Sequence, residues 1–194
     1  MHRAYKIALG SLVLNVVFSA YHLVIGVVTE SWWMITLGVY YFILSSVRFV
    51  VLRVKKMNLT VMKITGGMLM ALSFPLAATV ILSVISDRGN RYHEIIMIAI
   101  ATCSFLKITL ATVNFIRSRH RKSKKLITLR NVSFADGFVS IFALQRSMLV
   151  SFEGMSDIEI LIMNAATGSV VCVIAFMLGL NLVICDKKFN VLHN

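Results

Sequence analysis

Six runs of apolar residues, each long enough to cross a lipid bilayer, dominate the sequence. A helix needs about 20 apolar residues to span the hydrocarbon core. We expect spans at about 6–28, 32–53, 60–85, 93–117, 127–152 and 158–185. Of the 194 residues, 58% are hydrophobic and only 14% are charged, a balance typical of membrane proteins. The sequence therefore predicts an all-α membrane protein with six transmembrane helices in one bundle and one domain, residues 1–194.

Basic and acidic connecting segments alternate along the chain. Lys and Arg gather near the N-terminus, at 53–63, at 117–130 and at 185–189, whereas most acids lie at 28–31, 86–94 and 151–159. Short loops that are rich in Lys and Arg stay in the cytoplasm. We therefore expect a protein of the cell membrane with its basic loops and both termini in the cytoplasm. The net charge of +12 then reflects topology and contact with the lipid bilayer, and we expect no nucleic-acid partner.

The fifth run is the least regular, because Asn131, Asp136, Gln145 and Arg146 interrupt it. The alternation of the loops still requires it to be a span. An ionisable side chain is costly in lipid and usually faces the interior of the bundle. We therefore expect Asp136 and Arg146 to lie within the membrane.

Polar and small residues recur at helical spacing in four of the spans. Positions three, four and seven apart share one face of a helix. The stripes are Ser11, Asn15, Ser19, His22 and Gly26; Gly38, Tyr41, Ser45 and Arg48; Ser104, Lys107, Ala111 and Asn114; and Asp136, Ser140 and Ala143. They predict a polar bundle interior between spans one, two, four and five. The alternative is that small and hydroxyl residues only let the helices pack closely, as we expect for Gly66–Gly67 and residues 165–169.

From the stripes we select candidate residues that bind a ligand or line a pore: Asn15, His22, Tyr41, Ser45, Lys107, Asn114, Asp136 and Ser140. Lys107 and Asp136 lie at similar depth in their spans, so we expect them to form an ion pair. Arg48 lies about one turn further inward and is the alternative partner.

Arg146 lies in the outer half of the fifth span, away from the face that carries Asp136. We expect it to extend outward to the membrane surface, although pairing with Glu30 or Glu153, or contact with an anionic substrate, remains open. Trp32 and Trp33 are expected in the outer aromatic belt. Pro75 is expected to kink the third span.

Two stretches resemble the membrane domain of the cation diffusion facilitator family. Residues 15–45, NVVFSAYHLVIGVVTESWWMITLGVYYFILS, are similar to its first two spans, with Gly26 and Ser31 at its Gly and Gly-Ser positions. Residues 134–143, FADGFVSIFA, resemble its Ala-Asp-x-x-His-x-x-x-Asp motif through Ala135 and Asp136. The resemblance implies six spans with both ends in the cytoplasm.

The metal ligands of that family do not carry over to this chain. The ligand positions fall on Tyr40, Leu44, Val139 and Ala143. These side chains cannot supply the four ligands of a tetrahedral zinc site. The resemblance therefore implies a relative in fold that does not transport zinc. We expect no bound metal, no cofactor and no counterpart of the family's cytoplasmic domain after the sixth span.

Three classes of function follow from the sequence. The first is binding or translocation of a small solute or ion through the polar interior. Size and topology also look like the substrate-binding subunits of energy-coupling factor vitamin importers. The second is a non-catalytic accessory or sensor subunit, with a membrane protein or a second copy of the chain as its partner. The third is a membrane-embedded enzyme. The sequence contains no His-Glu-x-x-His or paired His motif, so we expect no catalytic residues.

Overall fold

The computed structural model describes residues 2–54, 59–85, 94–118, 124–151 and 156–191. Every regular element within these residues is an α-helix. The helices are α1 His2–Val28, α2 Trp32–Arg53, α3 Leu59–Ile85, α4 Glu94–Ser118, α5 Lys124–Ser151 and α6 Asp157–Val191. The expected all-α bundle is confirmed. The helix ends agree with the expected spans to within about four residues, except that α6 continues to Val191.

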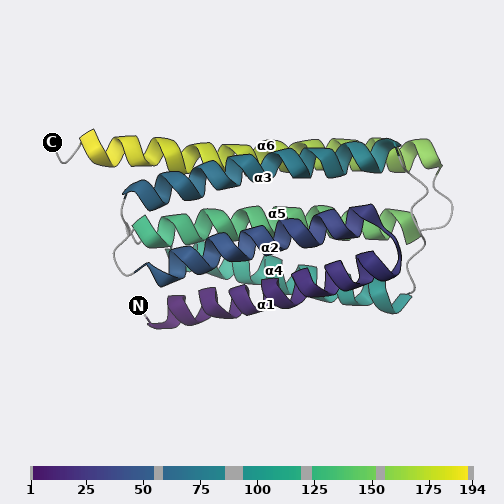
Figure 1. Cartoon of the computed structure of the whole chain (residues 1–194), viewed down its shortest axis with the longest axis horizontal. Helices are drawn as coiled ribbons and strands as arrows, with labels where there is room; N and C mark the ends of the chain where they lie inside the picture. Colours follow the sequence, from purple (N-terminus) through teal and green to yellow (C-terminus); the bar gives the residue numbers. More distant parts are fainter. Residues whose placement is uncertain (1, 55–58, 86–93, 119–123, 152–155, 192–194) are drawn as a thin grey trace.

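The six helices lie along a common axis in three tiers (Figure 1). α3 and α6 lie side by side along one edge, α1 and α4 along the opposite edge, and α2 and α5 between them. The closest pairs are α3 with α6, α1 with α2 and α4 with α5. α1 begins and α6 ends at the same end of the bundle. Because α2 and α5 are covered on both sides, their inward faces and those of α1 and α4 can enclose polar groups.

The outer surface of the bundle is apolar. Within the described residues, five helices are long and apolar enough to cross a membrane, whereas the apolar stretch of α4 is shorter, Met97–Val113. Large hydrophobic side chains are exposed on the outer faces of the helices, for example Val17, Phe74 and Val170. Such a surface is unfavourable in water and suits a lipid environment. The fold is therefore that of a membrane protein.

α3 and α6 approach each other closely because each has a glycine at the contact. A Cβ atom on Gly66 would lie 2.8 Å from the carbonyl oxygen of Gly179, and one on Gly179 would lie 2.7 Å from that of Gly66. In lipid, where water does not drive helices together, such backbone contact is a principal source of stability. Gly67 has no atom within 4 Å of its Cβ position, so only Gly66 has the expected packing role. α3 continues through Pro75 without interruption.

A short connection at Thr29–Ser31 fixes α1 against α2. Gly26 lies against the first turn of α2, where a Cβ atom would be 2.8 Å from the backbone nitrogen of Ile35. Ser19 donates a hydrogen bond of 2.8 Å to the carbonyl oxygen of Gly38. At the other end of α2, Lys125 of α5 donates to the carbonyl oxygens of Leu52 and Val54. These contacts hold the polar stripes of α1, α2 and α5 in register.

Candidate functional site

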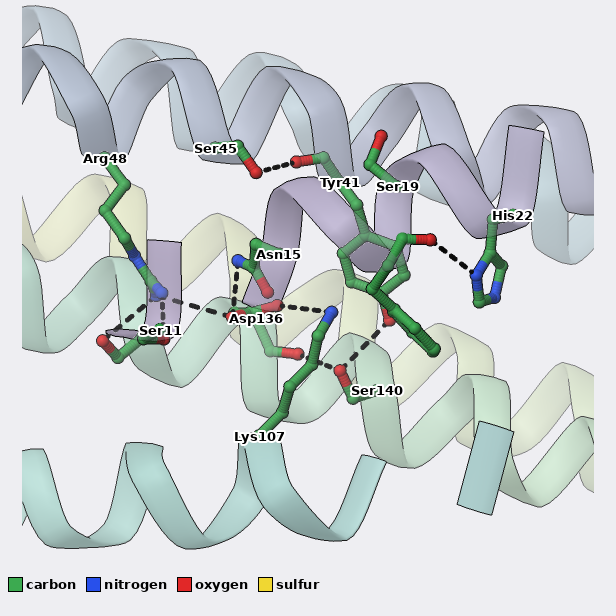
Figure 2. Close-up of polar contacts among 12 residues, drawn as sticks. Ser11, Asn15, Ser19, His22, Tyr41, Ser45, Arg48, Lys107, Asp136 and Ser140 are labelled. Atoms are coloured by element: carbon green, nitrogen blue, oxygen red, sulfur yellow. Dashed lines mark hydrogen bonds and ion pairs between the residues drawn. The ribbon is translucent and has the colours of Figure 1, made fainter. Parts of the chain in front are cut away.

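A buried carboxylate, Asp136 of α5, lies at the centre of the polar interior (Figure 2). Its Oδ2 atom accepts a hydrogen bond of 2.7 Å from Nδ2 of Asn15 and lies 3.5 Å from the guanidinium of Arg48. Its Oδ1 atom lies 3.3 Å from Nζ of Lys107. The three partners come from α1, α2 and α4. One side chain of α5 therefore links all the helices around the polar interior.

Arg48 is held by more than the carboxylate. One terminal nitrogen donates to Oγ of Ser11, and the other donates to Oγ of Ser133 at 3.1 Å. The side chain is only 1% exposed. A guanidinium presents its donors in a fixed plane, so hydrogen bonds to α1 and α5 restrict its orientation. Arg48 is therefore a fixed positive charge at the inner side of Asp136.

Lys107 has a different environment, in which aromatic rings replace hydroxyl groups. Its Nζ atom lies 3.4 Å from the ring centroid of Tyr41 and 4.3 Å from that of Phe18. The negative face of an aromatic ring attracts a cation, and the attraction increases when water is excluded. Lys107 is 2% exposed. Its ammonium thus lies between one carboxylate and two aromatic side chains, which we call the ammonium cage: Phe18, Tyr41 and Asp136.

Tyr41 is oriented by a hydrogen-bond chain. Ser140 donates to the backbone carbonyl of Asp136 at 2.8 Å. Its hydroxyl proton is then used, so the contact of 3.1 Å between Tyr41 and Ser140 has the tyrosine as donor. Ser45, another candidate, donates to the backbone carbonyl of Tyr41 within α2 (Figure 2). Ser140 therefore positions the ring, whereas Ser45 contacts only its own helix.

His22 is fully buried on the outer side of the cage. Its Nδ1 atom lies 3.1 Å from the carbonyl oxygen of Phe18, which can only accept, so Nδ1 carries a proton. Its ring meets those of Phe18 and Tyr41 edge-on, with centroids 4.2 and 5.7 Å away. Its Nε2 atom has no hydrogen-bond partner among the described residues. His22 therefore borders the cage with a polar atom to which no described residue is hydrogen-bonded.

The polar centre holds two cations, Arg48 and Lys107, against one carboxylate, Asp136. An excess of one positive charge in a low-dielectric interior is costly, because each unpaired ion costs several kcal/mol. Several polar atoms of buried side chains around it also lack hydrogen-bond partners among the described residues: Asn15 Oδ1, His22 Nε2, Arg48 Nε and Ser104 Oγ. Both properties are those expected of a site that interacts with a further molecule.

Arg146 and Trp33 correct two expectations from the sequence. Arg146 is only 6% exposed, and its guanidinium carbon lies 4.9 Å from the centroid of the Trp33 ring. It therefore does not extend outward to the membrane surface. Trp33 is also 6% exposed and faces the interior, whereas Trp32 is 75% exposed, as a belt residue should be. Stacking on an aromatic face inside the bundle replaces the expected contact with headgroups.

The structure brings together most of the candidates selected from the sequence. Asn15 and Lys107 both contact Asp136, Tyr41 and Ser140 adjoin them, and His22 and Ser45 border the group. The side chain of Asn114 lies outside the described residues. At the positions of the family's metal ligands, Tyr40, Leu44, Val139 and Ala143 are all buried in the apolar core. Within the described part of the chain, no three His, Cys, Asp or Glu residues are grouped to hold a metal ion.

Three members of the site are not among the candidates selected from the sequence. Ser11 belongs to the predicted polar stripe of the first span, and Ser133 lies three residues before Asp136, and both accept hydrogen bonds from Arg48. Phe18 is the third of these residues, and it lies three residues after Asn15 and four before His22. That spacing places Phe18 on the same helix face as the polar residues, which is the signal that identifies it.

The fold and its apolar surface define a multi-pass, all-α membrane protein with a charged, buried centre. No protein-family model matches the chain. A search of curated proteins finds no match either.

Proposed function

We propose that the protein binds or translocates a small solute or ion at the polar centre formed by α1, α2, α4 and α5. The observation that carries this proposal is the buried cluster of Arg48, Lys107 and Asp136, which has one cation more than it has carboxylates. Ionisable groups within a membrane are expensive and usually mark a path or binding site for a solute. The charges come from three different helices, so a change in their pairing would change how the helices pack.

The experiment is a solute screen on the purified wild-type protein in detergent. The probes are alkali and divalent metal chlorides, inorganic anions, small carboxylates and small amines, each at matched ionic strength. A solute that binds the folded state raises the melting temperature in a saturable manner. Any solute that does so is then tested for flux in proteoliposomes. We expect Asp136→Asn to abolish both effects.

Thr102→Ala is the matched control for that screen. Thr102 is exposed on α4, and its hydroxyl donates only to the carbonyl oxygen of Ile98 in the same helix. The control variant should respond as the wild type does. If no probe stabilises the wild type, or if Asp136→Asn retains the full response, the polar centre is not a solute site.

A second candidate function is that of a non-catalytic accessory or sensor subunit. The observation that favours it is that both oxygens of Asp136 already have protein partners. A network whose members are all paired with one another can have a purely structural role, in which it holds the helices together. Purification distinguishes the two functions, because an accessory subunit co-purifies with a second membrane protein, whereas a solute-binding protein is isolated alone with its ligand.

We also place the protein in the cell membrane, with both termini and the basic loops in the cytoplasm. This part of the proposal rests on the alternation of basic and acidic connecting segments.

A further inference from the structure

The ammonium cage is built from three helices other than the one that carries Lys107. Phe18 comes from α1, Tyr41 from α2 and Asp136 from α5, whereas Lys107 extends from α4. Proteins recognise the ammonium groups of ligands with this combination of aromatic faces and a carboxylate. In this bundle the ammonium that occupies the cage belongs to the chain itself.

The cage walls are held in place by contacts that do not involve Lys107. Tyr41 donates to Ser140, and Ser140 donates to the backbone of Asp136. Asn15 and Arg48 hold the Oδ2 atom of Asp136, so Oδ1 alone faces Lys107. A site whose walls are fixed independently of its occupant is pre-organised for another occupant of the same shape and charge.

Lys107 is also the cation that the charge balance does not require. Arg48 alone compensates the charge of Asp136, and it does so with hydrogen bonds to Ser11 and Ser133 in addition. The stem of Lys107 is a flexible chain of four carbons, whereas the guanidinium of Arg48 is fixed. Of the two cations, Lys107 is therefore the one that can leave the centre without exposing an unpaired carboxylate.

We infer that the cage is a binding site for the ammonium group of a small primary amine, and that this amine displaces Lys107. The inference rests on the proposed function, since it names the solute class of the same site. A divalent metal ion is disfavoured, because it requires several oxygen ligands and the cage offers one carboxylate. Asn15 and His22, which border the cage, each keep one polar atom, Oδ1 and Nε2 respectively, without a hydrogen-bond partner among the described residues.

The test uses n-propylammonium, which has the atoms that Lys107→Ala removes. At matched ionic strength, a saturating concentration should raise the melting temperature of Lys107→Ala by about 5 °C. The wild type should show the same saturable response at higher concentration, because its own lysine competes. 1-Propanol, which has the same length and no charge, should have no specific effect on either protein.

Three variants serve as controls. Lys107→Met fills the cage with a neutral chain of similar length and should not respond. Lys107→Ala/Asp136→Asn lacks the carboxylate and should not respond either. Lys107→Ala/Tyr41→Leu lacks one aromatic wall and should bind n-propylammonium about ten-fold more weakly. Should Lys107→Ala fail to fold alone, its recovery from membranes with n-propylammonium, but not with 1-propanol, in the buffer gives the same answer.

Five results would overturn the inference. Equal stabilisation by 1-propanol would show cavity filling, and a response from Lys107→Met would place the amine elsewhere. No response from Lys107→Ala would show that the cage does not recognise ammonium. If Lys107→Ala folds poorly, equal recovery with n-propylammonium and with 1-propanol would show the same. A response from Lys107→Ala without one from the wild type would show that Lys107 is never displaced. In each case the proposed function is tested independently, because it depends on the response of the wild type to the other probes of the solute screen.

Discussion

At the scale of single residues, Asp136 and Lys107 should contribute unequally to stability although they contact each other. Asp136→Asn leaves two buried cations without a carboxylate, whereas Lys107→Met leaves Arg48 and Asp136 as a neutral pair. We expect Asp136→Asn to lower the free energy of unfolding by ~3–5 kcal/mol and Lys107→Met by ~1 kcal/mol or less. Thermal unfolding in detergent measures both changes.

The double variant Asp136→Asn/Lys107→Met completes the cycle. It restores an excess of one positive charge, so its stability loss should be smaller than the sum of the two single losses. Strictly additive losses would mean that the 3.3 Å contact between the two side chains carries no interaction energy.

Zinc should not bind to the protein at the positions where the cation diffusion facilitator family has its ligands. Those positions hold Tyr40, Leu44, Val139 and Ala143, which are all buried in the apolar core. Isothermal calorimetry in detergent should show no stoichiometric binding of zinc. Tight binding that Tyr40→Phe abolishes would contradict the interpretation of these residues.

At the scale of secondary-structure elements, the contact between α3 and α6 depends on one glycine of the Gly66–Gly67 pair. Gly66→Ala places a methyl group 2.8 Å from a backbone oxygen of α6, so the helices must separate. We expect a loss of ~1–3 kcal/mol. Gly67→Ala meets no atom within 4 Å and should be neutral or stabilise the helix by up to ~1 kcal/mol.

Melting temperatures of the two variants in detergent give the comparison. Equal effects of Gly66→Ala and Gly67→Ala would show that the backbone contact between Gly66 and Gly179 does not contribute to stability.

Helical spacing was sufficient to predict which faces of α1, α2, α4 and α5 point inward. The period of 3.6 residues determines the relative direction of side chains such as Asn15, Tyr41 and Asp136. It does not determine which helices become neighbours or which rotamer a long side chain adopts. Lys107 and Asp136 were matched by depth alone, but Arg146 was placed at the surface because the sequence does not show that the ring of Trp33 lies within its reach.

At the scale of the whole molecule, the orientation in the membrane is a prediction from the loops. A reporter fused after Lys188 or within residues 119–125 should be found in the cytoplasm, because the adjoining segments are basic. A reporter within residues 86–92 should be found on the opposite face. Signals from the opposite face for the fusion within 119–125 would reverse the assignment of all six spans.

The position of Asp136 on α5 has a consequence for biosynthesis. Arg48 and Lys107 are synthesised earlier in the chain, and within the described residues Asp136 is the only carboxylate that pairs with them. Until the fifth span is inserted, the first four helices carry two uncompensated cations, each costing ~2.5–3.5 kcal/mol in lipid. A fragment of residues 1–118 should therefore be degraded rapidly in a pulse-chase experiment. Co-expression of residues 119–194 should extend its half-life, whereas the same fragment with Asp136→Asn should not. During synthesis, the first two-thirds of the chain therefore become resistant to degradation only after the single acidic side chain of Asp136 has entered the membrane.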